Sequence, residues 1–173
     1  MKRFLIIIAG LLLTLGLAWA DEATISMFVA TDAGPGNAIG TVAVRDTPYG
    51  ALFTPDLNGF TPGLHGFHVH QHADCGPQQK DGKMVPGLAA GGHYDPAGSG
   101  RHEGPYGNGH LGDLPPLYVD ESGGSSLPVL APRLKVADLK GRSLMIHAGG
   151  DNFSDHPEML GGGGPRKACG VVQ

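Results

Sequence analysis

Helical periodicity is almost absent from this sequence. Apolar residues rarely recur at the three- and four-residue spacing of an amphipathic helix, which argues against a helix bundle. The HExxH zinc motif and any nucleophile–base arrangement are also missing, so a zinc hydrolase is disfavoured. No internal repeat and no linker divides the chain. Residues 21–173 are therefore expected to form one domain with its own hydrophobic core.

Long apolar runs are missing except at the N-terminus. Residues 4–17 are predominantly apolar, Lys2 and Arg3 precede them, and Ala18-Trp19-Ala20 follows. This order is typical of a secretory signal peptide that is cut after about Ala20. The alternative is a retained membrane anchor, but the run is shorter than the roughly 20 residues that span a bilayer. We therefore expect residues 1–20 to be removed, and residues 21–173 to be exported without membrane association.

Positive charge is scarce. The formal net charge is −4, and it becomes −6 once Lys2 and Arg3 are removed with the leader. Domains that bind nucleic acid are usually basic, so this balance argues against a nucleic-acid partner.

Cysteine is scarce as well, since Cys75 and Cys169 are the only two in the sequence. In an exported protein an even pair of cysteines usually forms a disulfide. The alternative, two separate buried thiols, suits the cytosol better. We therefore expect one disulfide that closes a long loop and stabilises the domain.

Short segments of alternating apolar and polar residues follow one another along the chain. Residues 23–30 show the period-two pattern of a half-buried strand. Further strands are expected over residues 38–47, 50–57, 65–72, 117–120, 127–136, 143–149 and 169–172. Residues 136–142 are expected to form no more than a short turn. Many short strands separated by glycine, proline, asparagine and aspartate predict an all-β antiparallel sandwich or barrel.

Two long segments, residues 75–116 and 149–168, are rich in glycine and lack the strand pattern. Loops of this length in a compact domain are usually disordered or functional. The first segment contains four candidate metal ligands, so we expect a functional loop that is held in place by metal and disulfide.

Four of the nine histidines fall within residues 65–72. Residues two apart in a strand point to the same face, so His68 and His70 project together while their apolar neighbours face the other side. Two imidazoles placed in this way suit neighbouring positions around one metal ion. His147, at the end of another expected strand, is a third candidate ligand.

The long loop supplies further ligand types. Glycines between them let the backbone bring together side chains that are distant in sequence. Three imidazoles and one carboxylate suit a closed tetrahedral zinc site, and imidazole also suits copper. The loop candidates are His93, His102, His110 and Asp113. The remaining histidines are interpreted as ordinary surface or hydrogen-bonded residues, with a weak metal-binding role for His72 as a minority alternative: His65, His72 and His156.

Five blocks occur in a fixed order between residues 63 and 172: "GLHGFHVH", "GGHYDP", "GRHEGPYGNGHLGDLP", "SLMIHAGGDNFSDHP" and "GGGGPRKACGVV". The ordered set resembles the copper/zinc superoxide dismutases, in particular the bacterial exported type. That resemblance implies a Greek-key, immunoglobulin-like β-sandwich or barrel with two long functional loops.

The resemblance also implies a set of site residues. Copper would be held by His68, His70, His93 and His147. Zinc would be held by His93, His102, His110 and Asp113. His93 would be shared, with one ring nitrogen facing each metal. Asp151 matches the carboxylate that links a copper histidine to a zinc histidine. Arg166 matches the arginine at the copper mouth, where a guanidinium attracts and orients a small anion.

The function implied is conversion of superoxide to oxygen and hydrogen peroxide by redox cycling of copper, as an antioxidant defence outside the cytoplasm. The resemblance places the protein in the periplasm, as a monomer or a homodimer. A non-enzymatic copper-binding or copper-delivery protein on the same sandwich is expected to lack a copper ligand or Arg166. A copper-only dismutase is expected to lack the zinc ligands His102, His110 and Asp113, and all three are present.

Overall fold

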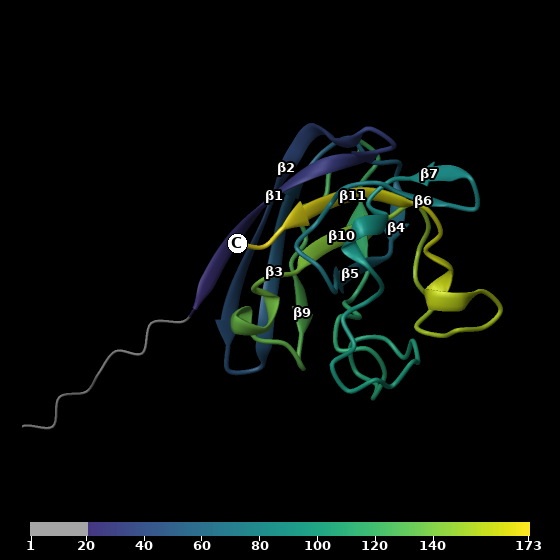
Figure 1. Ribbon diagram of the computed structural model, residues 1–173. Helices are drawn as coiled ribbons and strands as arrows, with labels where there is room; N and C mark the ends of the chain where they lie inside the picture. The colour runs from purple at the N-terminus through teal and green to yellow at the C-terminus, as the bar shows by residue number, and fades with distance from the viewer. Residues whose placement is uncertain (1–20) are drawn as a thin grey trace, which may run out of the picture.

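The computed structural model describes residues 21–173, and the expected signal peptide, residues 1–20, lies outside them (Figure 1). The described chain consists mainly of short β-strands. These are β1 (Glu22–Thr31), β2 (Gly34–Thr47), β3 (Gly50–Leu57), β4 (Gly63–His65), β5 (Phe67–His70), β6 (Gln78–Lys80), β7 (Lys83–Val85), β8 (Leu117–Val119), β9 (Val129–Ala131), β10 (Ser143–His147) and β11 (Arg166–Val171). Three short 3-10 helices accompany them within residues 21–173: η1 (Leu88–Ala90), η2 (Val136–Leu139) and η3 (Met159–Gly162). No helix of this part of the chain is long and apolar enough to cross a membrane.

Seven strands form one antiparallel sheet in the order β5-β10-β11-β1-β2-β3-β9. Two smaller antiparallel pairs, β4–β8 and β6–β7, complete the strand pairing. The large sheet curls around the core, with the long strands β1 and β2 along one side (Figure 1). This arrangement confirms the predicted all-β antiparallel architecture, and η2 confirms the short turn that was expected after residue 135.

The core follows from the alternation along the strands. Ile25 and Met27 of β1 are buried while Thr24 and Ser26 are exposed, as the period-two pattern predicts. Phe53 of β3 and Phe67 of β5 pack edge to face across the core, with ring centroids 5.6 Å apart. Val69 is also fully buried in the same cluster, so the faces of β5 divide between apolar core and histidine ligands.

The single strand expected over residues 65–72 is in fact two strands that belong to different sheets. β4 pairs with β8, whereas β5 pairs with β10. Gly66 separates them because its N–H donates to the Gly149 carbonyl and its own carbonyl accepts from the His147 N–H, each at 2.8 Å. The sequence pattern gave no signal for this change of partner.

The expectation that residues 75–116 lack strands is wrong for one short piece. β6 and β7 form an antiparallel hairpin that turns at Asp81-Gly82, where φ is 51° and 76°. Positive φ at both turn residues suits the tight hairpin turn that Asp-Gly favours. The second expected loop also ends earlier than residue 168, because β11 begins at Arg166.

Cys75 and Cys169 form the predicted disulfide, with their Cα atoms 5.7 Å apart. The bond joins the loop after β5 to β11 across 94 residues of sequence. Both cysteines are buried, and they pack with Ala90 and Met145. The disulfide therefore fixes the start of the long loop against the strand that carries Arg166.

Candidate metal centre

Four buried histidines converge from two strands and one loop. His68 and His70 come from β5, His147 ends β10, and isolated bridges with β5 hold the loop residues His93 and Asp113 beside it. One ligand atom from each histidine lies within 4.8 Å of the others. We call this group the four-histidine cluster: His68, His70, His93 and His147.

In three of these rings the nitrogen that points away from the cluster has a hydrogen-bond partner. His68 Nε2–H donates to Asp151 Oδ2 at 2.7 Å. His70 Nδ1–H donates to the Gly91 carbonyl at 2.9 Å, and His147 Nδ1–H donates to the Gly164 carbonyl at 3.1 Å. These bonds fix the tautomer and the orientation of each ring, so the second nitrogen carries a lone pair.

The nitrogens that face the centre of the cluster are buried and have no protein partner. They are His68 Nδ1, His70 Nε2, His93 Nε2 and His147 Nε2. A buried polar atom without a partner is costly, so such atoms indicate a ligand. Four imidazole lone pairs gathered in one buried cluster are a suitable donor set for copper.

A second set of donors gathers around Asp113, which is almost fully buried. Its Oδ1 lies 2.9 Å from His93 Nδ1 and 3.4 Å from His110 Nδ1, and its Oδ2 lies 3.1 Å from His102 Nδ1. Neighbouring donors of a tetrahedral zinc site are about 3.3 Å apart when each bond is about 2.0 Å long. The three histidines and one carboxylate therefore fit zinc. We call this group the carboxylate cluster: His93, His102, His110 and Asp113.

His68 also has a ligand atom within 4.8 Å of His93, His102 and Asp113. However, its Nε2 is occupied by Asp151, and its one free nitrogen, Nδ1, already belongs to the four-histidine cluster. His110 Nδ1 is buried and unpartnered, so it is the better fourth donor of the carboxylate cluster.

Asp151 joins the two clusters from outside. Besides His68, it accepts a hydrogen bond from His102 Nε2–H at 2.8 Å through Oδ1. The backbone nearby leaves no space for a side chain, since a Cβ on Gly161 would lie 2.2 Å from Asp151 Oδ1. Gly161 also has a φ of 75°, so this position strongly favours glycine.

His93 lies between the two clusters. Its Nδ1 is 2.9 Å from Asp113 Oδ1, while its Nε2 is one of the unpartnered nitrogens of the four-histidine cluster. Its ring stacks on His68, with centroids 3.8 Å apart. One imidazole therefore has a nitrogen available to each cluster.

Burial lowers the pKa of every ring in the four-histidine cluster, and the neighbouring imidazoles add to this effect for His68 and His70. The pKa of His147 is lowered to about 4 by burial, with His93 and Arg166 contributing in the same direction. These rings are therefore neutral at pH 7, which is the protonation state that binds a metal.

In the carboxylate cluster, by contrast, the charged forms of Asp113 and His102 are favoured. Burial opposes ionisation of Asp113, but the three histidine rings close to its carboxylate lower its pKa well below the usual range. Burial also opposes charging of His102, but the neighbouring carboxylates of Asp113 and Asp151 raise its pKa to about 9.

Arg166 is fixed beside His70. Its Nη1 donates to the Gly87 carbonyl at 2.5 Å and its Nη2 donates to the Gly91 carbonyl at 2.6 Å. The Gly91 carbonyl also accepts from His70 Nδ1–H, so the guanidinium and this ring share one acceptor. The half-buried charge thus lies next to the four-histidine cluster.

The other histidines differ in their surroundings. His72 and His156 are exposed and belong to neither cluster. His65 is 2 % exposed, with Nδ1 2.7 Å from the His147 carbonyl and Nε2 2.8 Å from the Thr61 carbonyl. The expectation of an ordinary hydrogen-bonded residue thus fits His65, but its contact with the backbone of His147 had no signal in the sequence.

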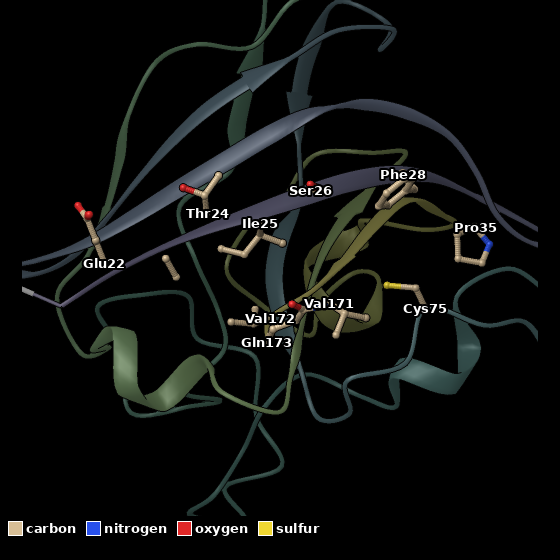
Figure 2. A pocket seen from close by; sticks show the side chains of 11 residues that line it. Glu22, Thr24, Ile25, Ser26, Phe28, Pro35, Cys75, Val171, Val172 and Gln173 are labelled. Carbon is tan, nitrogen blue, oxygen red and sulfur yellow. The ribbon is translucent and has the colours of Figure 1, made fainter.

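A groove of about 710 Å³ lies elsewhere, between β1 and the C-terminal residues (Figure 2). The residues that line it include Glu22, Thr24, Cys75 and Gln173. No member of the four-histidine cluster or the carboxylate cluster lines it. The large groove is therefore distinct from the metal centre.

The curled antiparallel sheet carries two adjoining clusters of buried residues that could each hold a metal ion, and His93 has one ring nitrogen near each cluster. The family model described as copper/zinc superoxide dismutase (SODC) matches residues 38–172. The chain belongs to this family.

Curated relatives and solved structures agree with the family match. The chain is 50 % identical to a Cu-Zn superoxide dismutase of Brucella melitensis over 174 residues, which covers 100 % of both chains. The Cu/Zn superoxide dismutase structure from Brucella abortus has a TM-score of 0.87 at 52 % identity, covering 88 % of this chain and 100 % of that one. A solution structure of the monomeric copper, zinc superoxide dismutase from Salmonella enterica has a TM-score of 0.80 at 51 % identity, with the same coverage.

The protein is accordingly an antioxidant enzyme that converts superoxide to oxygen and hydrogen peroxide, and its metals are copper and zinc.

Proposed function

We propose that superoxide reacts at the four-histidine cluster, which holds copper, and that the carboxylate cluster holds zinc beside it. One observation carries this assignment. Seven buried ligand atoms of the two clusters have no protein partner within the described chain, while the second ring nitrogens of His68, His70, His102 and His147 are hydrogen-bonded. When bound, copper supplies one-electron oxidation and reduction, and zinc supplies a fixed positive charge.

His93 has two roles in the proposed mechanism. Its Nδ1 is directed to the zinc side and its Nε2 to the copper side, so the ring joins the two sites. Two superoxide ions and two protons give one oxygen and one hydrogen peroxide, so the site must deliver protons. We assign one of these protons to His93 Nε2, which holds it between the two half-reactions and releases it to the departing peroxide.

Arg166 attracts and orients the anion. Two backbone carbonyls hold its guanidinium in place, so little conformational freedom is lost when a substrate approaches. A fixed cation beside the cluster raises the local concentration of superoxide.

The ligand assignment is tested by metal analysis and a superoxide-consumption assay on purified protein. We expect one copper and one zinc per chain in the wild type. His68→Ala and His147→Ala should lose copper and activity while they retain zinc. His110→Ala should lose zinc before it loses copper. His72→Ala is the matched control, because His72 is exposed and lies in neither cluster. Full copper occupancy and wild-type turnover in His147→Ala would contradict the assignment.

We further propose that residues 1–20 direct export, and that residues 21–173 act in the periplasm. The disulfide supports an oxidising compartment. Mass spectrometry of protein from the periplasmic fraction should show an N-terminus at or near Asp21. A mature protein that retains residues 1–20 would refute the cleavage.

Each chain carries both clusters, so a monomer and a homodimer are equally able to act. Sedimentation of the metal-loaded protein over a range of concentrations decides between them.

A further inference from the structure

We propose that Arg133 is a positioning residue for the zinc site, because its side chain holds residues 104–110 in the ligand-binding arrangement before metal arrives. This inference depends on the proposed function, in which the carboxylate cluster binds zinc.

Arg133 donates hydrogen bonds to four backbone carbonyls of one loop. Nε donates to Pro105 at 3.0 Å, and Nη1 donates to Gly109 at 3.1 Å. Nη2 donates to Gly104 at 3.1 Å and to His110 at 2.6 Å. All three nitrogens of the guanidinium are therefore engaged, and every acceptor lies within seven consecutive residues.

The loop depends on such contacts because it has little regular structure of its own. No strand or helix occurs between η1 and β8, that is, within residues 91–116 of the described chain (Figure 1). Glycines at 104, 107, 109 and 112 give this loop many alternative conformations when it is free. Fixing one backbone residue costs about 1–2 kcal/mol of conformational entropy, so a preformed loop improves zinc affinity.

The hydrogen bond to the His110 carbonyl connects Arg133 directly to the carboxylate cluster. Arg133 binds the His110 carbonyl, and the His110 N–H donates to the Arg101 carbonyl at 2.9 Å. Both peptide groups of His110 are therefore held while its ring nitrogen Nδ1 lies 3.4 Å from Asp113. His102, another histidine of the carboxylate cluster, is held separately, because its N–H donates to Asp155 at 2.9 Å.

Arg133 is itself firmly anchored. It follows β9, which pairs with β3, and the neighbouring Leu134 is buried and accepts the Ala51 N–H through its carbonyl at 3.0 Å. No ion pair of residues 21–173 includes Arg133, so its donors are directed to the loop rather than to a carboxylate. The planar fork of a guanidinium presents five N–H groups, and a lysine ammonium has only three donors on one nitrogen.

The test compares Arg133→Met and Arg133→Lys with wild type and with Arg45→Met. Arg45 lies on the exposed face of β2, so Arg45→Met removes the same charge without touching the loop. Zinc affinity is measured by competition with a chromogenic chelator, and copper affinity is measured separately. Amide hydrogen exchange of the zinc-free proteins then reports the order of residues 101–113.

Both Arg133 variants should bind zinc about 10–100-fold more weakly, as is typical when a residue that supports a metal ligand is removed. Their copper affinity should change far less, and hydrogen exchange should increase in residues 101–113 in particular. A general loss of stability would instead lower both affinities together. Wild-type zinc affinity in Arg133→Met, or full rescue by Arg133→Lys, would overturn the inference. If the wild-type protein itself bound no zinc, the proposed function would fail instead.

Discussion

Reduction of the Cys75–Cys169 disulfide should lower the thermal stability of the protein substantially. The two cysteines are 94 residues apart, and the chain-entropy relation gives about 4.7 kcal/mol for a loop of that size. For a domain of this length, each kcal/mol changes the melting temperature by about 2–4 °C. We therefore expect the melting temperature to fall by roughly 10–20 °C.

Calorimetry of the metal-free protein before and after reduction measures this effect, with titration of two thiols as proof of reduction. Chemical reduction breaks the disulfide and substitutes no residue, so the comparison measures the contribution of the cross-link alone. The double variant Cys75→Ala/Cys169→Ala is the control, and the reductant should not change its melting temperature. An unchanged melting temperature in fully reduced wild-type protein would refute this reasoning.

Three further predictions concern the metal centre. Arg166→Glu should slow superoxide consumption about tenfold or more and flatten its dependence on salt, because an attractive charge becomes repulsive. Stopped-flow rates at several ionic strengths measure this effect. An unchanged rate would show that Arg166 does not attract the substrate. Asp151→Asn should weaken both metal sites by about 10–100-fold, because Asp151 accepts hydrogen bonds from one histidine of each cluster, and chelator competition would show it. The metal-free protein should lose stability on acidification. The pKa of His147 is about 4 in the folded chain and about 6.5 in the unfolded chain. Between pH 6.5 and pH 4 the unfolded chain therefore binds one more proton at this residue than the folded chain does. Each such proton changes the free energy of unfolding by about 1.4 kcal/mol per pH unit, and denaturant titrations at pH 7 and pH 5 that gave equal stability would contradict this sign.

The parts of the fold that follow from local alternation were predictable from the sequence. Strands β1, β2 and β3 lie close to their expected positions, because one face of each is buried and the pattern repeats every two residues. The same rule predicted that His68 and His70 share a face, opposite the core residues Phe67 and Val69. The disulfide was predictable from the number of cysteines and the expected export.

The parts that depend on distant backbone contacts were not predictable. The change of sheet at Gly66 depends on carbonyl and N–H groups of residues 147–149. The β6–β7 hairpin was missed because each strand has only 3 residues, too few to show an alternating pattern, although Asp81-Gly82 is a recognised hairpin signal. Arg133 had no signal at all, because its partners are backbone carbonyls that a sequence does not distinguish.

The division of the ligands between copper and zinc came from the resemblance to the family, and the unpartnered ring nitrogens of the structure support it. His93 is the residue on which the whole arrangement depends, since it alone has a ring nitrogen available to each cluster.

Electron paramagnetic resonance of the protein with copper(II) in one site and cobalt(II) in place of zinc tests this shared ring most directly. If the imidazole of His93 joins the two ions, their spins couple and the ordinary copper(II) signal is largely lost. A copper signal of full intensity, unchanged by cobalt and equal to that of a His93→Ala variant, would show two isolated ions and contradict the account.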